Sequence, residues 1–267
     1  MIGEFKSALT KDLRIYLRYP SMVVGDALSI PLWFVLFVLA ASLFAPSELT
    51  ATGGYERAIS YFYWGFVFLT LLNTNLAGIA QYMLYEQATG TIEQFFLAPT
   101  NRLALIAGRW ARIMVTNLVV LIATTVFLLT AVGTSIMILN APMVIFLIVL
   151  LEFALLGVGL LLSGVSLIIK SVVTYLNYAW LAVMFLSGVF FPTSSLPQPL
   201  ETIALILPTT YYVDSIKFYA LGTQTLFAPN IELGLLIGIS IALFVLGLIT
   251  FDRMERIAKR RGRLGLY

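Results

Sequence analysis

The chain has 267 residues, of which 60% are hydrophobic and only 11% are charged, and its formal net charge is +3. Soluble domains carry roughly 25% charged residues, so the composition excludes an ordinary soluble protein. The absence of cysteine and histidine excludes disulfides, thiol nucleophiles, histidine zinc sites and histidine-based catalytic triads. We therefore expect an all-α integral membrane protein that forms one domain over residues 1–267.

The first twenty residues (1–20) predict an amphipathic helix that lies along the membrane interface. On a helical wheel, the apolar and basic side chains fall on opposite faces. The apolar face holds Phe5, Leu9, Leu13 and Tyr16, and the basic face holds Lys11, Arg14 and Arg18. The alternative is a basic leader that only sets the topology of the chain. A cleavable signal peptide is not expected, because the apolar run that follows is long enough to span a bilayer.

Six later stretches are long and apolar enough to cross a bilayer, for which about 20 residues are needed. They cover residues 22–44, 59–83, 113–132, 142–169, 171–191 and 231–251. In this arrangement, every Lys and Arg except Arg57 and Lys217 falls on one side of the membrane. The positive-inside rule therefore predicts that both termini are cytoplasmic. The basic tail, 253–267, either binds anionic lipid or only anchors the topology.

A charged interruption, Tyr85–Arg102, separates the second and third spans. Thr91 and Gln94 fit a capping box, the proline that follows ends the helix, and Gly90 before it is free to adopt unusual backbone angles. Three apolar side chains share one face of this short helix: Ile92, Phe95 and Phe96. We expect a short amphipathic helix on the cytoplasmic rim, over 86–98. The alternative is an ordinary interfacial loop whose Phe side chains lie among lipid headgroups.

Residues 193–222 precede the last span and are apolar but repeatedly interrupted by proline. They predict two helices that are too short to cross a bilayer. Such helices persist at membrane depth only where protein or a wet cavity surrounds them, so we expect two re-entrant helices on the outer side. Asp214 and Lys217 lie three residues apart on the second helix and are expected to compensate each other. The alternative is an extracellular loop with an amphipathic helix lying flat.

Glu152 lies near the middle of the fourth span. A charged group at that depth costs about 2.5–3.5 kcal/mol on insertion scales, so its carboxyl group should face protein. One interpretation is a carboxylate that binds a proton or substrate, and the other is an interhelical hydrogen bond that fixes packing. The second is favoured, because no basic residue within the membrane is placed to complete a proton relay.

Two motifs resemble those of type-2 ABC transporter permeases, the transmembrane subunits of ABC exporters. The first, YEQATGTIEQFFLAPTNRLALIAGR at residues 85–109, has the order of Glu, Gly-Thr-Ile-Glu, Pro and a later Gly that is found in the cytoplasmic loop of that family. The second, FLSGVFFPTSSLPQPLETIALILPTTYYVDSIKFYALG at residues 185–222, resembles the segment that leads into the family's last span. The length, the six spans and the N-terminal helix also match, so the resemblance covers essentially the whole chain.

This resemblance implies roles for particular residues. The cytoplasmic helix would be a coupling helix that docks into a groove of a separate ATPase subunit. Its residues, which we call the coupling residues, are Glu86, Gly90, Thr91, Ile92, Glu93, Phe95 and Phe96. The second and fifth spans would line the transport path at the interface of a permease dimer. The path candidates are Phe66, Asn73, Asn75, Asn177, Trp180, Met184 and Phe185, and their asparagine amides could equally hold helices together.

The resemblance also implies partners. These are two copies of an ABC ATPase, a second permease that is identical or a paralogue, and the lipid bilayer, but no nucleic acid. The chain lacks the G-x-x-x-x-G-K-[ST] phosphate-binding motif. ATP and Mg²⁺ are therefore expected on the ATPase, and this chain is expected to bind no cofactor or metal and to be no enzyme. Its expected location is the inner or plasma membrane of a prokaryotic cell.

The leading hypothesis is thus the permease subunit of an ATP-driven exporter. The rival is a self-sufficient secondary transporter or channel, which usually shows paired intramembrane charges or internal repeats, and the sequence shows neither. An intramembrane enzyme is disfavoured, because Glu152 has no second deep carboxylate beside it. Many aromatic and few charged residues on the second and fifth spans favour a drug, a lipid or another lipophilic or lipid-linked substrate.

Overall fold

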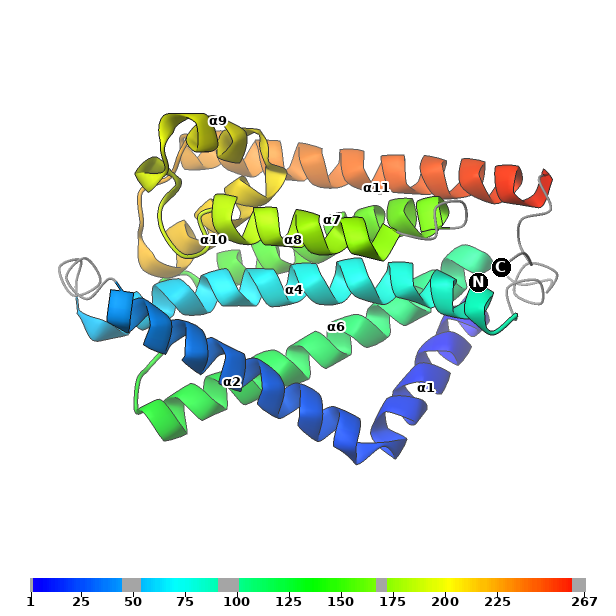
Figure 1. Cartoon of the computed structure of the whole chain (residues 1–267), viewed down its shortest axis with the longest axis horizontal. Coiled ribbons are helices and arrows are strands. Elements are labelled where there is room, and N and C mark those ends of the chain that lie inside the picture. Colours follow the sequence, from blue (N-terminus) through cyan, green and yellow to red (C-terminus); the bar gives the residue numbers. More distant parts are fainter. Residues whose placement is uncertain (1, 45–53, 91–100, 167–171, 261–267) are drawn as a thin grey trace.

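The computed structural model describes residues 2–44, 54–90, 101–166 and 172–260, and the regular elements in these ranges are all helices (Figure 1). In chain order, the α-helices are α1 (Ile2–Arg18), α2 (Pro20–Phe44), α4 (Tyr55–Ala88), α6 (Arg102–Phe127), α7 (Ala141–Ser166), α8 (Val172–Leu186), α9 (Gln198–Ile206), α10 (Pro208–Leu221) and α11 (Pro229–Arg260). A π-helical turn, Leu128–Val132, continues α6, and a 3-10 turn, Thr193–Ser195, precedes α9. The predicted all-α class is confirmed for the described residues.

Each predicted span contains a helix, but these helices differ in length and hydropathy. Among the described residues, three helices are long and apolar enough to cross a membrane: Arg102–Thr130, Ala141–Ser166 and Pro229–Ile257. The bent pair of α1 and the first part of α2 passes the same test when it is taken together. The fifth predicted span, 171–191, is shorter than expected, because α8 ends at Leu186 and the chain then bends.

The first two helices meet at a bend of 83°. Pro20 explains the break, because proline supplies no backbone N–H and disfavours helical angles for the residue before it. That residue, Tyr19, lies outside both helices. The apolar face of α1 packs against α6 with Tyr16 buried, while the basic face of α1 is exposed. The two faces predicted for this helix are therefore present.

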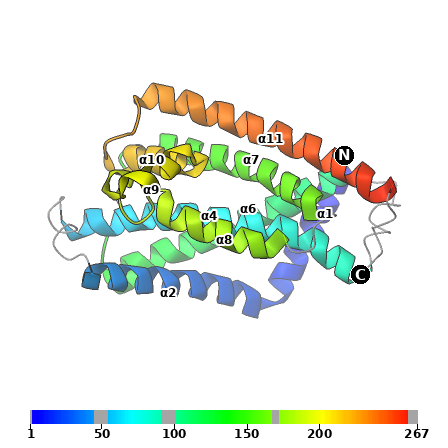
Figure 2. The ribbon, with the colours of Figure 1, turned by 45° about the horizontal axis from the view of Figure 1, so that its top comes forward.

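Helices α7 and α11 run side by side over much of their lengths (Figures 1 and 2). Glycines allow this approach: a methyl group on Gly247 would lie 2.0 Å from the carbonyl oxygen of Gly157. A methyl group on Gly164 would lie 3.0 Å from Cα of Phe251, further along the same pair. Small residues let helix backbones approach closely in membranes. The α7–α11 pair is therefore a tightly packed unit.

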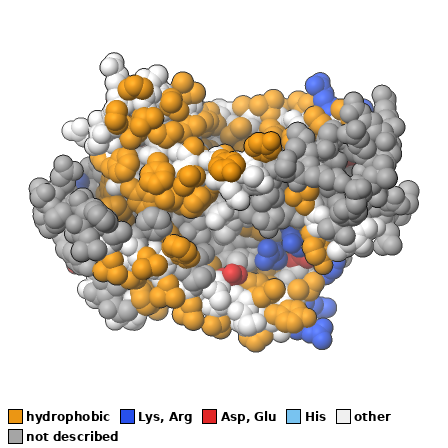
Figure 3. All heavy atoms as spheres, in the orientation of Figure 1, with side chains coloured by type: hydrophobic (Ala, Val, Ile, Leu, Met, Phe, Trp, Pro, Cys, Tyr) orange, Lys and Arg blue, Asp and Glu red, His pale blue; other side chains and the backbone are white. Residues whose placement is uncertain are grey.

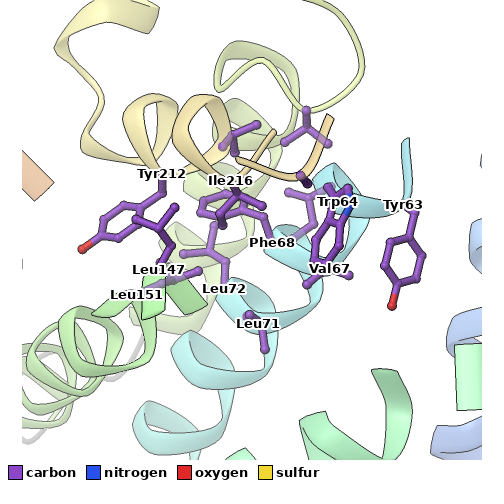
Figure 4. Close-up of a cluster of buried hydrophobic side chains, with 14 of the residues drawn as sticks. Tyr63, Trp64, Val67, Phe68, Leu71, Leu72, Leu147, Leu151, Tyr212 and Ile216 are labelled. Carbon is purple, nitrogen blue, oxygen red and sulfur yellow. The ribbon is translucent and has the colours of Figure 1, made fainter. Parts of the chain in front are cut away.

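The main hydrophobic core lies between α4, α7 and α10 (Figure 4). Tyr212 and Ile216 of α10 pack with Leu147 and Leu151 of α7 and with Phe68 of α4, and all five side chains are buried. Helix α10 is thus enclosed by the longer helices, whereas most of α9 is exposed. Of the two short helices before α11, α10 is therefore the one that belongs to the hydrophobic core.

The two ends of the molecule contain different elements (Figures 1 and 2). The start of α1, the end of α4, the start of α6 and the end of α11 lie at one end, which we call the terminal end. Helices α9 and α10 lie at the opposite end, which we call the outer-segment end. Figure 3 shows Lys and Arg side chains mainly toward the terminal end, with hydrophobic side chains over much of the remaining visible face. This distribution agrees with the charge pattern found in the sequence.

The glycine contact between α7 and α11 can be tested by adding one methyl group. Gly247→Ala places this group against the Gly157 backbone, and we expect it to destabilise the protein by about 1–3 kcal/mol, as overpacking usually does. Gly238→Ala is the matched control, because it lies in the same helix and a methyl group there meets no atom within 4 Å. The measurement is the thermal unfolding midpoint in detergent. Equal midpoints for both variants would contradict the close contact.

Candidate functional site

The structure describes two of the coupling residues, Glu86 and Gly90, which lie at the end of α4 and just after it. The others lie outside the described residues: Thr91, Ile92, Glu93, Phe95 and Phe96. Glu86 belongs to the last turn of α4, which ends at Ala88, so a separate helix over 86–98 does not begin at Glu86. The reason is that nothing before Gly90 breaks the helix. Gly90 itself has a φ of +71°, a left-handed conformation that glycine adopts at little cost.

Glu86 is held through an aromatic neighbour. The Tyr82 hydroxyl, one turn earlier in α4, hydrogen-bonds to the Glu86 carboxylate. The guanidinium group of Arg109 in α6 lies 4.6 Å from the centroid of the Tyr82 ring. Such cation–π contacts contribute about 0.5–1 kcal/mol at exposed sites. We call the predicted coupling helix, 86–98, the coupling segment. The end of α4 is therefore attached to α6 just where the chain enters this segment.

The chain is attached again where it leaves the coupling segment. Asn101 caps α6, because its side-chain oxygen accepts a hydrogen bond from the backbone N–H of Ala104 at 3.1 Å. The backbone N–H of Asn101 donates to Oε1 of Glu4 at 2.9 Å. The beginning of α6 is thus bound to the N-terminal helix α1.

Two ion pairs strengthen this attachment. Arg102 at the start of α6 pairs with Glu255 near the end of α11. Arg109, two turns later, pairs with Asp12 of α1 at 3.0 Å. We call these two pairs, together with the Glu4–Asn101 bond, the clamp. The clamp joins α1, α6 and α11 at the terminal end.

Glu152 lies where α4, α6 and α7 meet, and its side chain is 2% exposed. Asn75 Nδ2 donates to both carboxylate oxygens, at 3.3 and 3.1 Å, and Asn117 Nδ2 donates to Oε1 at 3.3 Å. The Thr74 hydroxyl donates to the side-chain oxygen of Asn117 at 2.8 Å. We call these four residues the central network. Its contacts are interhelical hydrogen bonds from neutral groups, as in one of the two interpretations of Glu152.

The path candidates lie in different surroundings, although α4 and α8 are in contact. Asn75 is fully buried and bound to Glu152, and Met184 is buried in the main core. Phe66 and Trp180 are half-buried against the same core, and Asn73, Asn177 and Phe185 are exposed. Within this set, the three exposed side chains are the ones that a substrate, lipid or second copy can reach directly.

Lys217 of α10 is 3% exposed, and backbone carbonyl groups bind its charge. Its ammonium group donates to the carbonyl oxygens of Gly188 and Val189 at 2.7 and 2.8 Å. It also lies 3.2 Å from the centroid of the Tyr61 ring in α4. Because α8 ends at Leu186, these carbonyl groups have left the helix and are available to an outside donor.

Lys217 and Asp214 interact through their opposite charges, as their spacing predicted, but the hydrogen bonds of Asp214 go to other groups. Its Oδ2 atom accepts a hydrogen bond from the backbone N–H of Leu226 at 2.7 Å. Glu232, in the first turn of α11, is fully buried beside Asp214. A spacing of three residues places two side chains on one helix face. It does not determine which neighbouring backbone groups will form hydrogen bonds with each charged side chain.

Sequence reasoning missed Asn117, Glu232 and the two acids of α1 in the clamp. Asn117 had a usable signal, because it is an amide within a predicted span, as Asn75 is. Glu4 and Asp12 had none, because they are ordinary charged residues in an amphipathic helix, and their partners lie 97 positions further along the chain.

The role of the central network can be tested with two substitutions of Glu152. Glu152→Gln keeps an acceptor, and its amide can donate to the buried side-chain oxygen of Asn75, which has no partner among the described residues. Glu152→Leu removes the acceptor of Asn117 and leaves Asn75 only the carbonyl oxygen of Leu71, which we expect to cost about 1–3 kcal/mol. The measurement is thermal unfolding in detergent together with transport. A Gln variant that is stable but inactive would show that the carboxyl group itself has a transport role.

The contact of Lys217 with the bend after α8 can be tested by thiol labelling, because the chain contains no cysteine. Val189→Cys, a buried position, is compared with and without Lys217→Met. Losing two hydrogen bonds of about 1 kcal/mol each should raise the labelling rate about thirtyfold through local opening. Lys11→Met on exposed α1 is the control and should leave the rate unchanged. Unchanged labelling with Lys217→Met would show that this lysine does not hold the bend.

Comparison with known protein families identifies the family of this chain. The profile of the ABC-2 family transporter proteins matches residues 35–249, which is most of the chain. No curated protein is similar enough to count as a match. The matched region contains the central network, Lys217 and all of the coupling residues. The chain therefore belongs to the ABC-2 family of transporter proteins and is a membrane-embedded permease of an ABC transporter.

Proposed function

We propose that this permease forms a dimer with an identical or paralogous copy, binds two ATPase subunits and exports its substrate. The family match over residues 35–249 carries this proposal. The polar attachments on both sides of the coupling segment support it, since a segment that receives force must be connected to the helices that move. The charge asymmetry supports a cytoplasmic terminal end, and the six predicted spans complete the proposed topology.

The proposed coupling acts through both attachments of the segment. On one side, α4 leads from Glu86 to Asn75 in the central network. On the other side, the clamp connects the start of α6 to α1 and α11. ATP-driven closure of the ATPases would push on the coupling residues and tilt the spans that these attachments connect to them. The permease would then alternate between inward-facing and outward-facing states.

We further propose a lipophilic substrate, such as a drug, a lipid or a lipid-linked compound. The side chains that face outward on α8 support this, because they are aromatic or apolar with a few uncharged polar groups: Tyr175, Asn177, Tyr178, Leu181 and Phe185. A path lined by such groups offers stacking and dispersion contacts to a lipophilic substrate. It offers few polar groups that could replace the water molecules around an ion.

A self-sufficient secondary transporter is the alternative, and Glu152 is the observation that bears on it. A proton or ion relay needs further titratable groups in contact with the buried carboxyl group. In the described parts of the chain, the groups at the Glu152 carboxyl are uncharged: the amides of Asn75 and Asn117, which donate to it, and the indole of Trp110. This environment supports a packing role over a relay.

The coupling proposal is tested by Phe95→Ala combined with Phe96→Ala. Each aromatic side chain that fills a pocket of the ATPase should contribute about 1–3 kcal/mol to docking. We expect the variant to insert and dimerise normally but to lose ATPase copurification and transport. Phe146→Ala combined with Phe191→Ala is the control, because these two exposed side chains belong to α7 and to the bend after α8.

Glu86→Ala separates docking from transmission. This change removes the carboxylate that Tyr82 binds but leaves the apolar docking side chains in place. Copurification should therefore persist, while substrate-stimulated ATP hydrolysis falls. The outcome that contradicts the proposal is normal assembly and wild-type transport by the double Phe variant. Transport by the chain alone, without any ATPase, would instead support the secondary transporter.

A further inference from the structure

The basic face of α1, formed by Lys11, Arg14 and Arg18, is exposed at the terminal end. Spacings of three and four residues place the three side chains on one side of the helix. Within the described ranges, none of them forms an ion pair with an acidic residue. The functions proposed above do not use this face, because the coupling residues and path candidates belong to other segments.

The acidic residues near this face are all engaged within the protein. Glu4 and Asp12 face α6, where they take part in the clamp. Asp26, at the start of α2, accepts a hydrogen bond from the Tyr16 hydroxyl at 3.1 Å. Burial and the neighbouring Asp26 raise the pKa of Tyr16 to about 12, so this hydroxyl stays protonated and able to donate. Negative charge therefore points inward on α1, and the outward charge is positive.

Exposed apolar side chains adjoin the basic face where α1 meets α2. Leu17 is 68% exposed, Met22 is 55% exposed, and Ile15 and Tyr19 are exposed as well. Because the first predicted span begins directly after this bend, the basic side chains lie within a few turns of the hydrocarbon boundary. Helices with apolar and basic side chains arranged in this way lie at the headgroup level of a bilayer.

We propose that the basic face of α1 binds the headgroups of anionic phospholipids. Charge complementarity selects this partner, because a Lys or Arg near an anionic membrane surface contributes about 1 kcal/mol. The clamp gives the contact a consequence, since it connects α1 to the start of α6 directly after the coupling segment. By binding α1, anionic lipid thereby holds the start of α6, where the chain leaves the coupling segment, at the membrane surface. The effect on coupling rests on the proposed function, whereas lipid binding does not.

The test measures lipid selectivity without the ATPase. The full chain is reconstituted in phosphatidylcholine vesicles that contain a trace of dansyl-labelled phosphatidylglycerol or dansyl-labelled phosphatidylcholine. Energy transfer from the chain's four tryptophans reports which lipid is enriched around the protein. Wild-type protein should favour phosphatidylglycerol, and the preference should weaken with added salt. Replacing Lys11, Arg14 and Arg18 by Gln should lower the preference about fivefold for each charge removed.

The matched control exchanges the basic residues but keeps the charge: Lys11→Arg, Arg14→Lys and Arg18→Lys. This variant should retain the preference, and Arg14→Gln alone should lower it about fivefold, which covers the case of a triple variant that does not fold. An unchanged preference in the Gln variants, or its loss in the charge-conserving control, would overturn the proposal. So would competition by millimolar inorganic phosphate, because the face would then bind free anions. Loss of ATPase copurification with unchanged lipid preference would identify the face as a protein contact.

Discussion

A polar group that enters the hydrocarbon region must find its partner within the protein, and this constraint organises the molecule. Glu152 meets it with amides from two other helices, which joins α4, α6 and α7 at mid-depth. Lys217 meets it with carbonyl groups at the end of α8, which joins α10 to the bend at the outer-segment end. Apolar side chains are about equally stable against lipid, so these few polar contacts act together with the close glycine packing of α7 and α11 to select which helices become neighbours.

The contacts connect several helices of the permease to one tightly packed pair, α7 and α11. Helices α7 and α11 pack through glycine without intervening side chains, so sliding between them would require backbone atoms to clash. Helix α11 is linked through Arg102 to the start of α6, and α4 is linked through Asn75 to α7. In the coupling proposed above, a displacement of the coupling segment would reach this unit from both sides, at one end of the molecule and at its centre.

Much of the fold was predictable, because hydropathy and proline follow local rules. Apolar length identified the positions of the long helices, prolines marked the two short helices before α11, and the opposite faces of α1 followed from helical periodicity. The site was less predictable, because its contacts join residues far apart in the chain. Spacing predicted the interaction of Asp214 with Lys217, yet each is hydrogen-bonded to backbone groups that only the folded chain brings near. Asn75 was expected either to line the transport path or to hold helices together, and only the folded chain shows that its amide lies against Glu152.

The central network also bears on biosynthesis. Translation proceeds from the N-terminus, so Asn75 and Asn117 are both made before Glu152. When the segment that carries the acid leaves the ribosome and enters the membrane, its two amide donors have already been inserted. The carboxyl group can therefore exchange water for these amides at once, without waiting in lipid for a later helix. Because Glu152 follows Asn75 and Asn117 in the chain, the costly insertion of its carboxyl group comes last, when both amide donors are already in the membrane.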